Sequence, residues 1–225
     1  MIVGLTTWEL LAVSRWVTYA ILLQGPLFQQ LEQSVLRRDL NAATRPVRLW
    51  SPGANGITML GHSSWPVYLG LGPAEYFDPV RMSAFAEDTD SRDSIAVRRH
   101  VQWLRDNGVT HLLSFEPLNA DLWPVRLVRA DFDRLMSIAW ARMNSPLYLY
   151  ELVDAPGRVV AVPGGNAVPV TSFVETANTV SFEVNLKAPT TVELRDLAYP
   201  GWQAMRNAVK AHHTAMTRPI LFAAK

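Results

Sequence analysis

His62 is the first histidine along the sequence, and its neighbours could give it a part in chemistry. It stands beside two hydroxyl residues in the segment GHSSW, and a histidine next to a serine can remove its proton and make it a nucleophile. The segment lacks the G-x-S-x-G spacing that presents a catalytic serine in α/β-hydrolases. A lone histidine in a turn is more often a structural hydrogen-bonding residue, so the sequence assigns no catalytic residue.

The other histidines and acids give no metal or cofactor site. His212 and His213 are adjacent, so they point in different directions and make a poor metal pair without further ligands. The acidic segment at residues 87–93 lacks the glycine and the closing glutamate of a calcium loop. The chain has no cysteine, which excludes disulfides and thiolate metal sites. One enzymatic alternative stays open: a soluble hydrolase or transferase that combines Asp or Glu with His62 or His111.

Residues 48–79 form a glycine- and aromatic-rich stretch that is expected to be a long loop. Glycines and prolines at this density indicate tight turns, and neither glycine motif that binds phosphate groups is present. Aromatic rings with a few polar groups are the chemistry of sugar sites, because rings stack on C–H groups and polar groups orient the ligand. The alternative is that the rings pin the loop to the core. The candidate ligand-binding surface consists of Asn55, His62, Trp65, Tyr68, Glu75 and Tyr76.

The charge balance argues against a nucleic-acid-binding protein. The chain of 225 residues has a net charge of +1, from 21 basic and 20 acidic residues, whereas nucleic acid requires a clustered basic face. With 49% hydrophobic residues, a chain of this length can bury the core of one large domain or of one and a half ordinary ones.

Two helices are expected in residues 1–44. The first begins at Thr6 with a capping-box pattern and ends at Leu23. Apolar side chains occur on almost all sides of this helix, which indicates burial in a protein core or in a membrane. The run is nevertheless short for a bilayer span and carries Arg15 near its middle. We expect a buried or interfacial helix that contacts a membrane or partner, with the remnant of a membrane helix as the alternative. There is no clear signal-peptide pattern. The second helix, residues 27–43, is amphipathic.

Residues 45–157 are expected to form a mixed α/β domain. A helix at 94–107 ends at an Asn-Gly stop and leads into a buried strand at 109–115, which is the αβ half of a Rossmann-like unit. The further elements expected are strands at 46–50, 123–129 and 146–152, and a helix at 132–142.

Residues 158–204 are expected to form a β-rich subdomain, followed by a basic tail at 205–225. Short runs rich in Val, Thr and Phe are separated by turn residues, and the run at 179–186 alternates polar and apolar side chains, which is typical of a half-buried antiparallel strand. The fold class is therefore mixed α/β: a Rossmann-like portion followed by a small, incomplete antiparallel β-sandwich. The strands expected in it are 159–162, 168–173, 179–186 and 190–197.

Three short motifs follow one another in a particular order. Gly108 and Val109 at a helix end run into the strand HLLS, the strand LYLYE follows at residues 147–151, and Asp196 begins the sequence DLAYPGW. In order and spacing, over residues 45–204, these segments resemble the C-terminal extracytoplasmic part of the YfhO-like bacterial membrane proteins. That family is related to the GT-C glycosyltransferases, which use lipid-linked sugars.

The resemblance implies a membrane-associated protein whose soluble part lies on the extracytoplasmic side and meets a glycan or lipid-linked sugar. In GT-C enzymes the acidic catalytic residues lie on a loop between membrane helices, and no position of this chain matches that loop. The resemblance therefore implies a non-catalytic domain without a cofactor, which supports the membrane part or holds a glycan. The chain departs from the family after Trp202, and we expect a truncated or frameshifted fragment. The alternatives are a stand-alone carbohydrate-active enzyme and a membrane- or partner-binding module.

Overall fold

The computed structural model describes residues 27–51, 60–65, 94–139, 145–162, 164–176, 179–184, 186 and 190–196. The expected helix that begins at Thr6, most of the stretch 48–79 and the basic tail at 205–225 lie outside these residues. Within them, no helix is long and apolar enough to cross a membrane.

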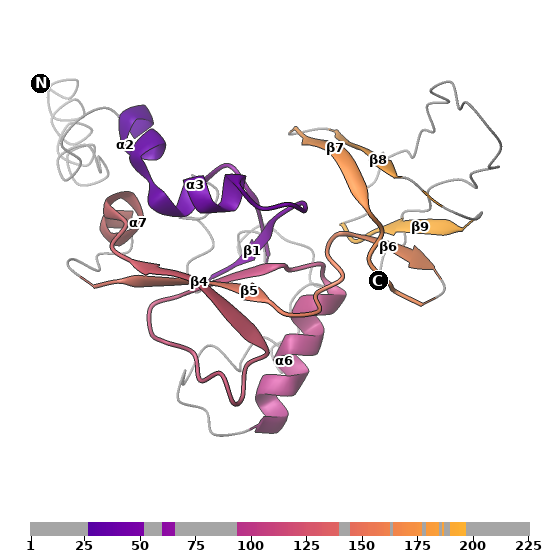
Figure 1. The fold of residues 1–225 in the computed structure, drawn as a ribbon, viewed down its shortest axis with the longest axis horizontal. Coiled ribbons are helices and arrows are strands. Elements are labelled where there is room, and N and C mark those ends of the chain that lie inside the picture. Colours follow the sequence, from indigo (N-terminus) through magenta and orange to yellow (C-terminus); the bar gives the residue numbers. More distant parts are fainter. Residues whose placement is uncertain are drawn as a thin grey trace, which may run out of the picture.

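A mixed sheet of five strands forms the centre of the larger part of the molecule (Figure 1). Its order is β2-β1-β3-β5-β4. β1 lies parallel to both β2 and β3, whereas β5 is antiparallel to β3 and to β4. A parallel pair needs a crossover connection, and α6 (Ser94–Asp106) lies between β1 and β3 in the sequence. The strand bounds are β1 Arg48–Trp50, β2 Ser63–Ser64, β3 His111–Ser114, β4 Val125–Asp131 and β5 Leu147–Leu152.

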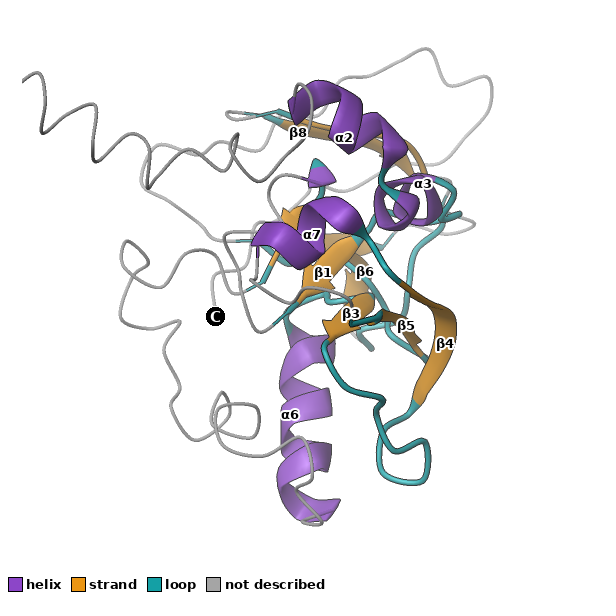
Figure 2. Ribbon diagram, turned by 90° about the vertical axis from the view of Figure 1, so that its left-hand side faces the viewer, coloured by secondary structure: helices purple, strands orange, loops and turns teal. Residues whose placement is uncertain are grey.

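Helices cover both faces of this sheet (Figures 1 and 2). One face packs on α6, where Trp50 and Leu112 meet the buried Val101 of the helix. The opposite face packs on α3 (Val35–Asn41) and α7 (Arg134–Ala139), where Leu113 meets buried residues of both helices. Alternate residues of each strand point to opposite faces, which explains why both clusters draw on β1, β3 and β5.

The single helix expected at residues 27–43 is two helices, α2 (Leu27–Gln33) and α3, so that expectation was wrong. The break lies at Ser34, which has an extended backbone with ψ of 119° and accepts a hydrogen bond from the Arg37 amide as the N-cap of α3. Its hydroxyl also donates to Asp133 Oδ2 at 2.7 Å. A capping serine tied to a buried aspartate explains the new helix start, and nothing local in the sequence identifies Asp133 as its partner.

The described residues of the β-rich part form two small antiparallel sheets, β6 (Val159–Val162) with β9 (Thr191–Leu194) and β7 (Val170–Glu175) with β8 (Val180–Val184). Both sheets contribute to one core, in which the stacked rings of Phe173 and Phe182 pack against the buried Val159 and Leu194. The mixed α/β fold class is therefore confirmed.

Candidate functional site

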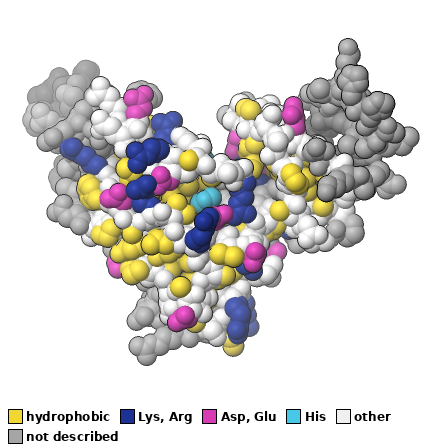
Figure 3. Space-filling model, in the orientation of Figure 1, with side chains coloured by type: hydrophobic (Ala, Val, Ile, Leu, Met, Phe, Trp, Pro, Cys, Tyr) yellow, Lys and Arg dark blue, Asp and Glu magenta, His cyan; other side chains and the backbone are white. Residues whose placement is uncertain are grey.

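A cleft of about 560 Å³ lies where the mixed sheet meets the β-rich part. Figure 3 shows the hollow between the two parts. Its volume falls within the usual range for small-ligand sites. The lining comes from the end of α3 and the segment leading into β1, from the turn before β2, and from β7: Leu40, Asn41, Ala43, Thr44, Arg45, Pro46, Val47, Gly61, His62, Ser63, Val170, Thr171, Ser172, Phe173 and Glu175.

His62 is held in one wall of the cleft by the last residue of α3. Its Nε2 atom lies 3.0 Å from Asn41 Oδ1, so the hydrogen bond fixes Nε2 as the protonated nitrogen. Burial lowers the pKa of His62, the charge of Arg37 lowers it further, and Glu175 across the cleft opposes the shift. The imidazole is therefore neutral at neutral pH and offers Nδ1 as an acceptor.

Arg45 lies in the same wall and makes three hydrogen bonds to its own chain. Its Nη1 donates to the Ala155 carbonyl at 2.5 Å, and its Nη2 donates to Glu151 Oε1 at 3.0 Å and to the Leu152 carbonyl at 3.4 Å. The hydrogen bond from Arg126 lowers the pKa of Glu151, and the charge of Arg45 adds to this effect against the opposing effect of burial. Glu151 therefore serves two guanidinium groups, those of Arg45 and Arg126.

His111 lies beside this pair without forming a catalytic couple. It is the cross-strand neighbour of Glu151, but its Nδ1 lies 2.9 Å from Thr110 Oγ1. Burial lowers the pKa of His111 to about 4, although the charge of Glu151 opposes the shift. A neutral histidine bonded to a threonine and 6% exposed is a structural residue of the sheet.

The opposite wall is an irregular part of β7. The register between β7 and β8 shifts between Thr171 and Val174, and Ser172 has a φ of 51°. A side chain in this left-handed region carries backbone strain, and such residues and bulges are enriched at functional sites. The bulge sits in the cleft wall beside Phe173 and Glu175.

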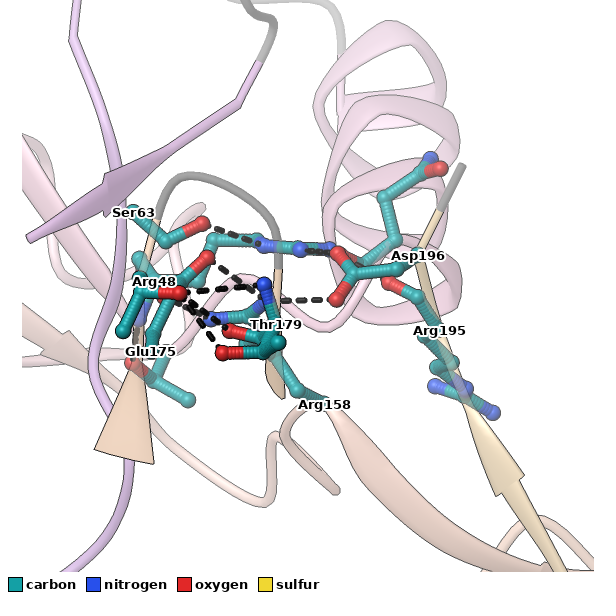
Figure 4. A network of polar contacts seen from close by, with 10 residues as sticks. Arg48, Ser63, Arg158, Glu175, Thr179, Arg195 and Asp196 are labelled. Carbon is teal, nitrogen blue, oxygen red and sulfur yellow. Dashed lines mark hydrogen bonds and ion pairs between the residues drawn. The ribbon is translucent and has the colours of Figure 1, made fainter. Parts of the chain in front are cut away.

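A buried network of charges fixes the β-rich part to the sheet (Figure 4). Arg158, 1% exposed at its side chain, donates to both oxygens of Glu175 at 2.5 and 3.1 Å and to Asp196 Oδ2. The other oxygen of Asp196 accepts from Arg48 of β1, 3% exposed. Two arginines and two carboxylates therefore balance one another across the junction, and the network ends at the cleft through Glu175.

The carboxyl end of α6 completes the junction. Arg48 Nη1 donates to the Asn107 carbonyl at 2.8 Å, and Arg195 Nη1 donates to the Arg105 carbonyl at 2.5 Å. The last carbonyls of a helix lack partners within the helix and carry partial negative charge, so guanidinium groups stabilise this end. Gly108, with φ of 70°, follows directly and lies against Gly157 and Arg158.

The sequence-predicted site residues have different outcomes. His62 lines the cleft. Trp65 does not lie on a surface: it is 5% exposed, its ring lies near Trp103, and the Arg48 guanidinium lies over it at 5.5 Å. Its assignment as a surface sugar-stacking residue was therefore wrong, because the indole is part of the core on the α6 side of the sheet. The remaining candidates lie outside the described residues: Asn55, Tyr68, Glu75 and Tyr76.

The opposite wall was missed by reasoning from the sequence. Ser172 and Glu175 belong to an ordinary run of strand residues, and nothing in that run signals a bulge. Asp196 was noticed only as the first residue of a motif, whereas its partner Arg48 lies 148 positions earlier. One signal was present in the sequence: Arg158 stands directly before the apolar run at residues 159–162. An arginine buried with such a run requires an acid as its partner.

The polar groups of the cleft define what it can contact. In the described part of the chain, no carboxylate hydrogen-bonds to His62 or His111, and no group of acids, histidines or cysteines could hold a metal ion. The cleft walls instead offer amide, hydroxyl, imidazole and carboxylate groups, which suit a polar, uncharged ligand.

Comparisons with known proteins identify no relative: no family model, no curated protein and no solved structure matches the chain.

Proposed function

We propose that this chain is a non-catalytic, carbohydrate-binding domain of a membrane-associated, glycosyltransferase-related protein of the YfhO-like type. The observation that carries the proposal is the cleft of about 560 Å³ between the sheet and the β-rich part. Its walls combine hydroxyl and amide side chains with the strained residue Ser172. Sugars are recognised by several hydrogen bonds of this kind, which orient the ring within a concave site.

The class of protein rests on the resemblance of the ordered motifs around Gly108, in residues 147–151 and from Asp196. By that resemblance the domain acts on the extracytoplasmic side, where it holds a glycan or a lipid-linked sugar for a membrane-embedded partner. The N-terminal run that begins at Thr6 and ends at Leu23 supplies the membrane or partner contact in this proposal.

The alternative of a hydrolase or transferase has less support. A catalytic histidine needs a nucleophile or acid within hydrogen-bond reach and a group that orients it. His62 is bonded to an amide and His111 to a threonine. The Asn41 amide is not a nucleophile, and the Thr110 hydroxyl is fully buried and bonded to the Arg48 backbone, out of reach of a substrate.

Isothermal titration of the full chain with maltohexaose, cellohexaose and chitohexaose tests the proposal. We expect at least one of these sugars to bind, His62→Ala to weaken that binding about tenfold, and Ser181→Ala on the exposed face of β8 to leave it unchanged. In a second arm, the full chain should float with liposomes and a chain without residues 1–25 should not. No binding to any sugar, or equal binding by the His62→Ala variant, refutes the cleft as a carbohydrate site.

A further inference from the structure

Glu175 is the one carboxylate among the described residues that line the cleft, and it is held in a fixed position. Both of its oxygens accept hydrogen bonds from Arg158, at 2.5 and 3.1 Å, while its side chain remains 37% exposed. A carboxylate oxygen has two lone-pair positions. Each oxygen that is bonded to Arg158 therefore keeps a further position for a donor from a ligand.

Arg158 is positioned in turn by groups that lie outside the cleft. Its side chain is 1% exposed, Nη2 also donates to Asp196, and its guanidinium lies over the Phe173 ring at 5.1 Å. Phe173 is itself stacked on Phe182. Arg158 thus fixes two neighbouring residues of the cleft wall, one carboxylate and one ring, without contacting the cleft as a lining residue.

The other charged residue of the lining is Arg45, which donates to Glu151 and to two backbone carbonyls, and the remaining polar lining is hydroxyl, amide or neutral imidazole. The Arg158 side chain is buried behind Glu175, at 1% exposed against 37%, so an anionic ligand would meet the carboxylate before the guanidinium. To pair with Arg45, the ligand would have to compete with the contacts that Arg45 makes within the protein. Repulsion between the Glu175 carboxylate and an acidic ligand would weaken the binding of that ligand relative to an uncharged one.

We propose that Glu175 is the specificity-determining residue of the cleft: it accepts hydroxyl hydrogens from an uncharged sugar and rejects acidic glycans, with Arg158 as its positioning residue. This inference rests on the proposed carbohydrate function and adds the class of sugar and the residues that select it. Arg37 is a further cation outside the lining that acts on the cleft, through its effect on the pKa of His62, and the test therefore includes it.

The test compares a neutral probe with an acidic probe in matched variants. The neutral probe is whichever of maltohexaose, cellohexaose and chitohexaose binds the full chain, and the acidic probe is hexagalacturonate. For the unmodified chain we expect at least tenfold tighter binding of the neutral sugar. Glu175→Gln keeps the shape and removes the charge, so we expect it to weaken neutral binding about tenfold and to reduce the discrimination to about threefold or less.

Two further variants separate recognition from folding. Glu175→Asp keeps the charge but shortens the side chain, so it should lose affinity and keep the rejection of hexagalacturonate. Asp121→Asn removes an equal charge from an exposed loop and should change neither binding constant. Arg158→Lys loses the two-pronged hydrogen bond and should weaken neutral binding, with the unfolding temperature measured alongside to separate this effect from loss of fold.

The outcomes distinguish this inference from the proposed function. If a neutral sugar binds but Glu175→Gln binds both probes as the unmodified chain does, the role of Glu175 is refuted while the carbohydrate function stands. If the unmodified chain binds hexagalacturonate more tightly than the neutral sugar, the inference is also overturned. Loss of that preference in Arg37→Gln would then identify Arg37 as the residue that binds the acidic sugar. If no probe binds the unmodified chain, the carbohydrate function itself fails and the inference falls with it.

Discussion

Replacing Asp196 by Asn tests whether the charge network holds the two parts of the molecule together. The substitution keeps the shape of the side chain and removes one of the two negative charges that face the Arg48 and Arg158 guanidinium groups. Asp196 accepts from Arg48 with one oxygen and from Arg158 with the other. An asparagine can present only one oxygen, so one of the two guanidinium groups faces an amide NH₂ that cannot accept its hydrogen bond.

The size of the effect follows from burial. The two guanidinium side chains are 3% and 1% exposed, and Asp196 is 17% exposed. Removing one partner from a buried ion pair typically costs about 3–5 kcal/mol, because the remaining charge stays out of water without compensation. For a chain of this size, about 1 kcal/mol corresponds to roughly 2–4 °C in unfolding temperature. We therefore expect a decrease of about 6–20 °C.

Urea unfolding measured by circular dichroism provides the assay, with the dependence on urea compared between variants to establish that the same surface is exposed. Asp131→Asn is the control, because its pair with Arg129 spans 3.5 Å and Asp131 is 48% exposed. Exposed pairs contribute about 0–1 kcal/mol. A free energy of unfolding for Asp196→Asn within about 0.5 kcal/mol of that control would refute the argument that this junction depends on buried charge.

Two further predictions concern the sheet and the end of α6. Because burial holds the pKa of His111 at about 4, below the unfolded value of about 6.5, the unfolded chain takes up the proton first as pH falls. Stability should therefore decrease between these values by at most about 3.4 kcal/mol, at about 1.36 kcal/mol per pKa unit. His111→Gln should make the urea midpoints measured from pH 7 to 5 less dependent on pH, whereas an unchanged dependence contradicts the assignment. Gly108→Ala forces a residue with a Cβ to a φ of 70° and places that atom 2.9 Å from the Gly157 carbonyl oxygen, so it should cost more than the roughly 1–2 kcal/mol of the left-handed backbone alone. The matched variant Gly61→Ala, at φ of 79° with nothing within 4 Å, should cost only that backbone term, and equal losses in the two variants would remove the steric part of the argument.

The sequence predicts much of the secondary structure because most helices and strands show a characteristic pattern within their own residues. The expected helix at 94–107 corresponds to α6, and three of the four residues expected on its apolar side, Val97, Val101 and Leu104, lie in the core. The fourth, Ile95, is 52% exposed, so that part of the prediction was wrong. The strand expected at 159–162 corresponds to β6, and the expected strand at 146–152 contains β5. The spacing of apolar residues and the residues that end helices are both set by nearby positions in the sequence, so they can be recognised without a structure.

What the sequence does not predict depends on residues that are distant along the chain. The break at Ser34 needs Asp133, which lies 99 positions away. The strand β2 has two residues and exists only because it pairs with β1. The cleft is lined by residues near Asn41 and His62 and by residues of β7. No local sequence pattern predicts that these distant segments lie side by side. Aromatic content suggested a surface at Trp65, where tertiary packing instead buries the ring.

The unequal size of the cores has a consequence for how the molecule opens. Among the described residues, the two clusters on the faces of the sheet contain ten and thirteen buried apolar residues, and the cluster of the β-rich part contains four. Regions with few buried contacts open at a lower free energy than the rest of a protein, as cooperative units of their own. The β-rich part is therefore the first such unit, and its opening removes the wall that carries Glu175 while the His62 wall stays folded. A ligand that bridges both walls binds only the closed form, so occupancy of the cleft and local folding of the β-rich part are thermodynamically linked.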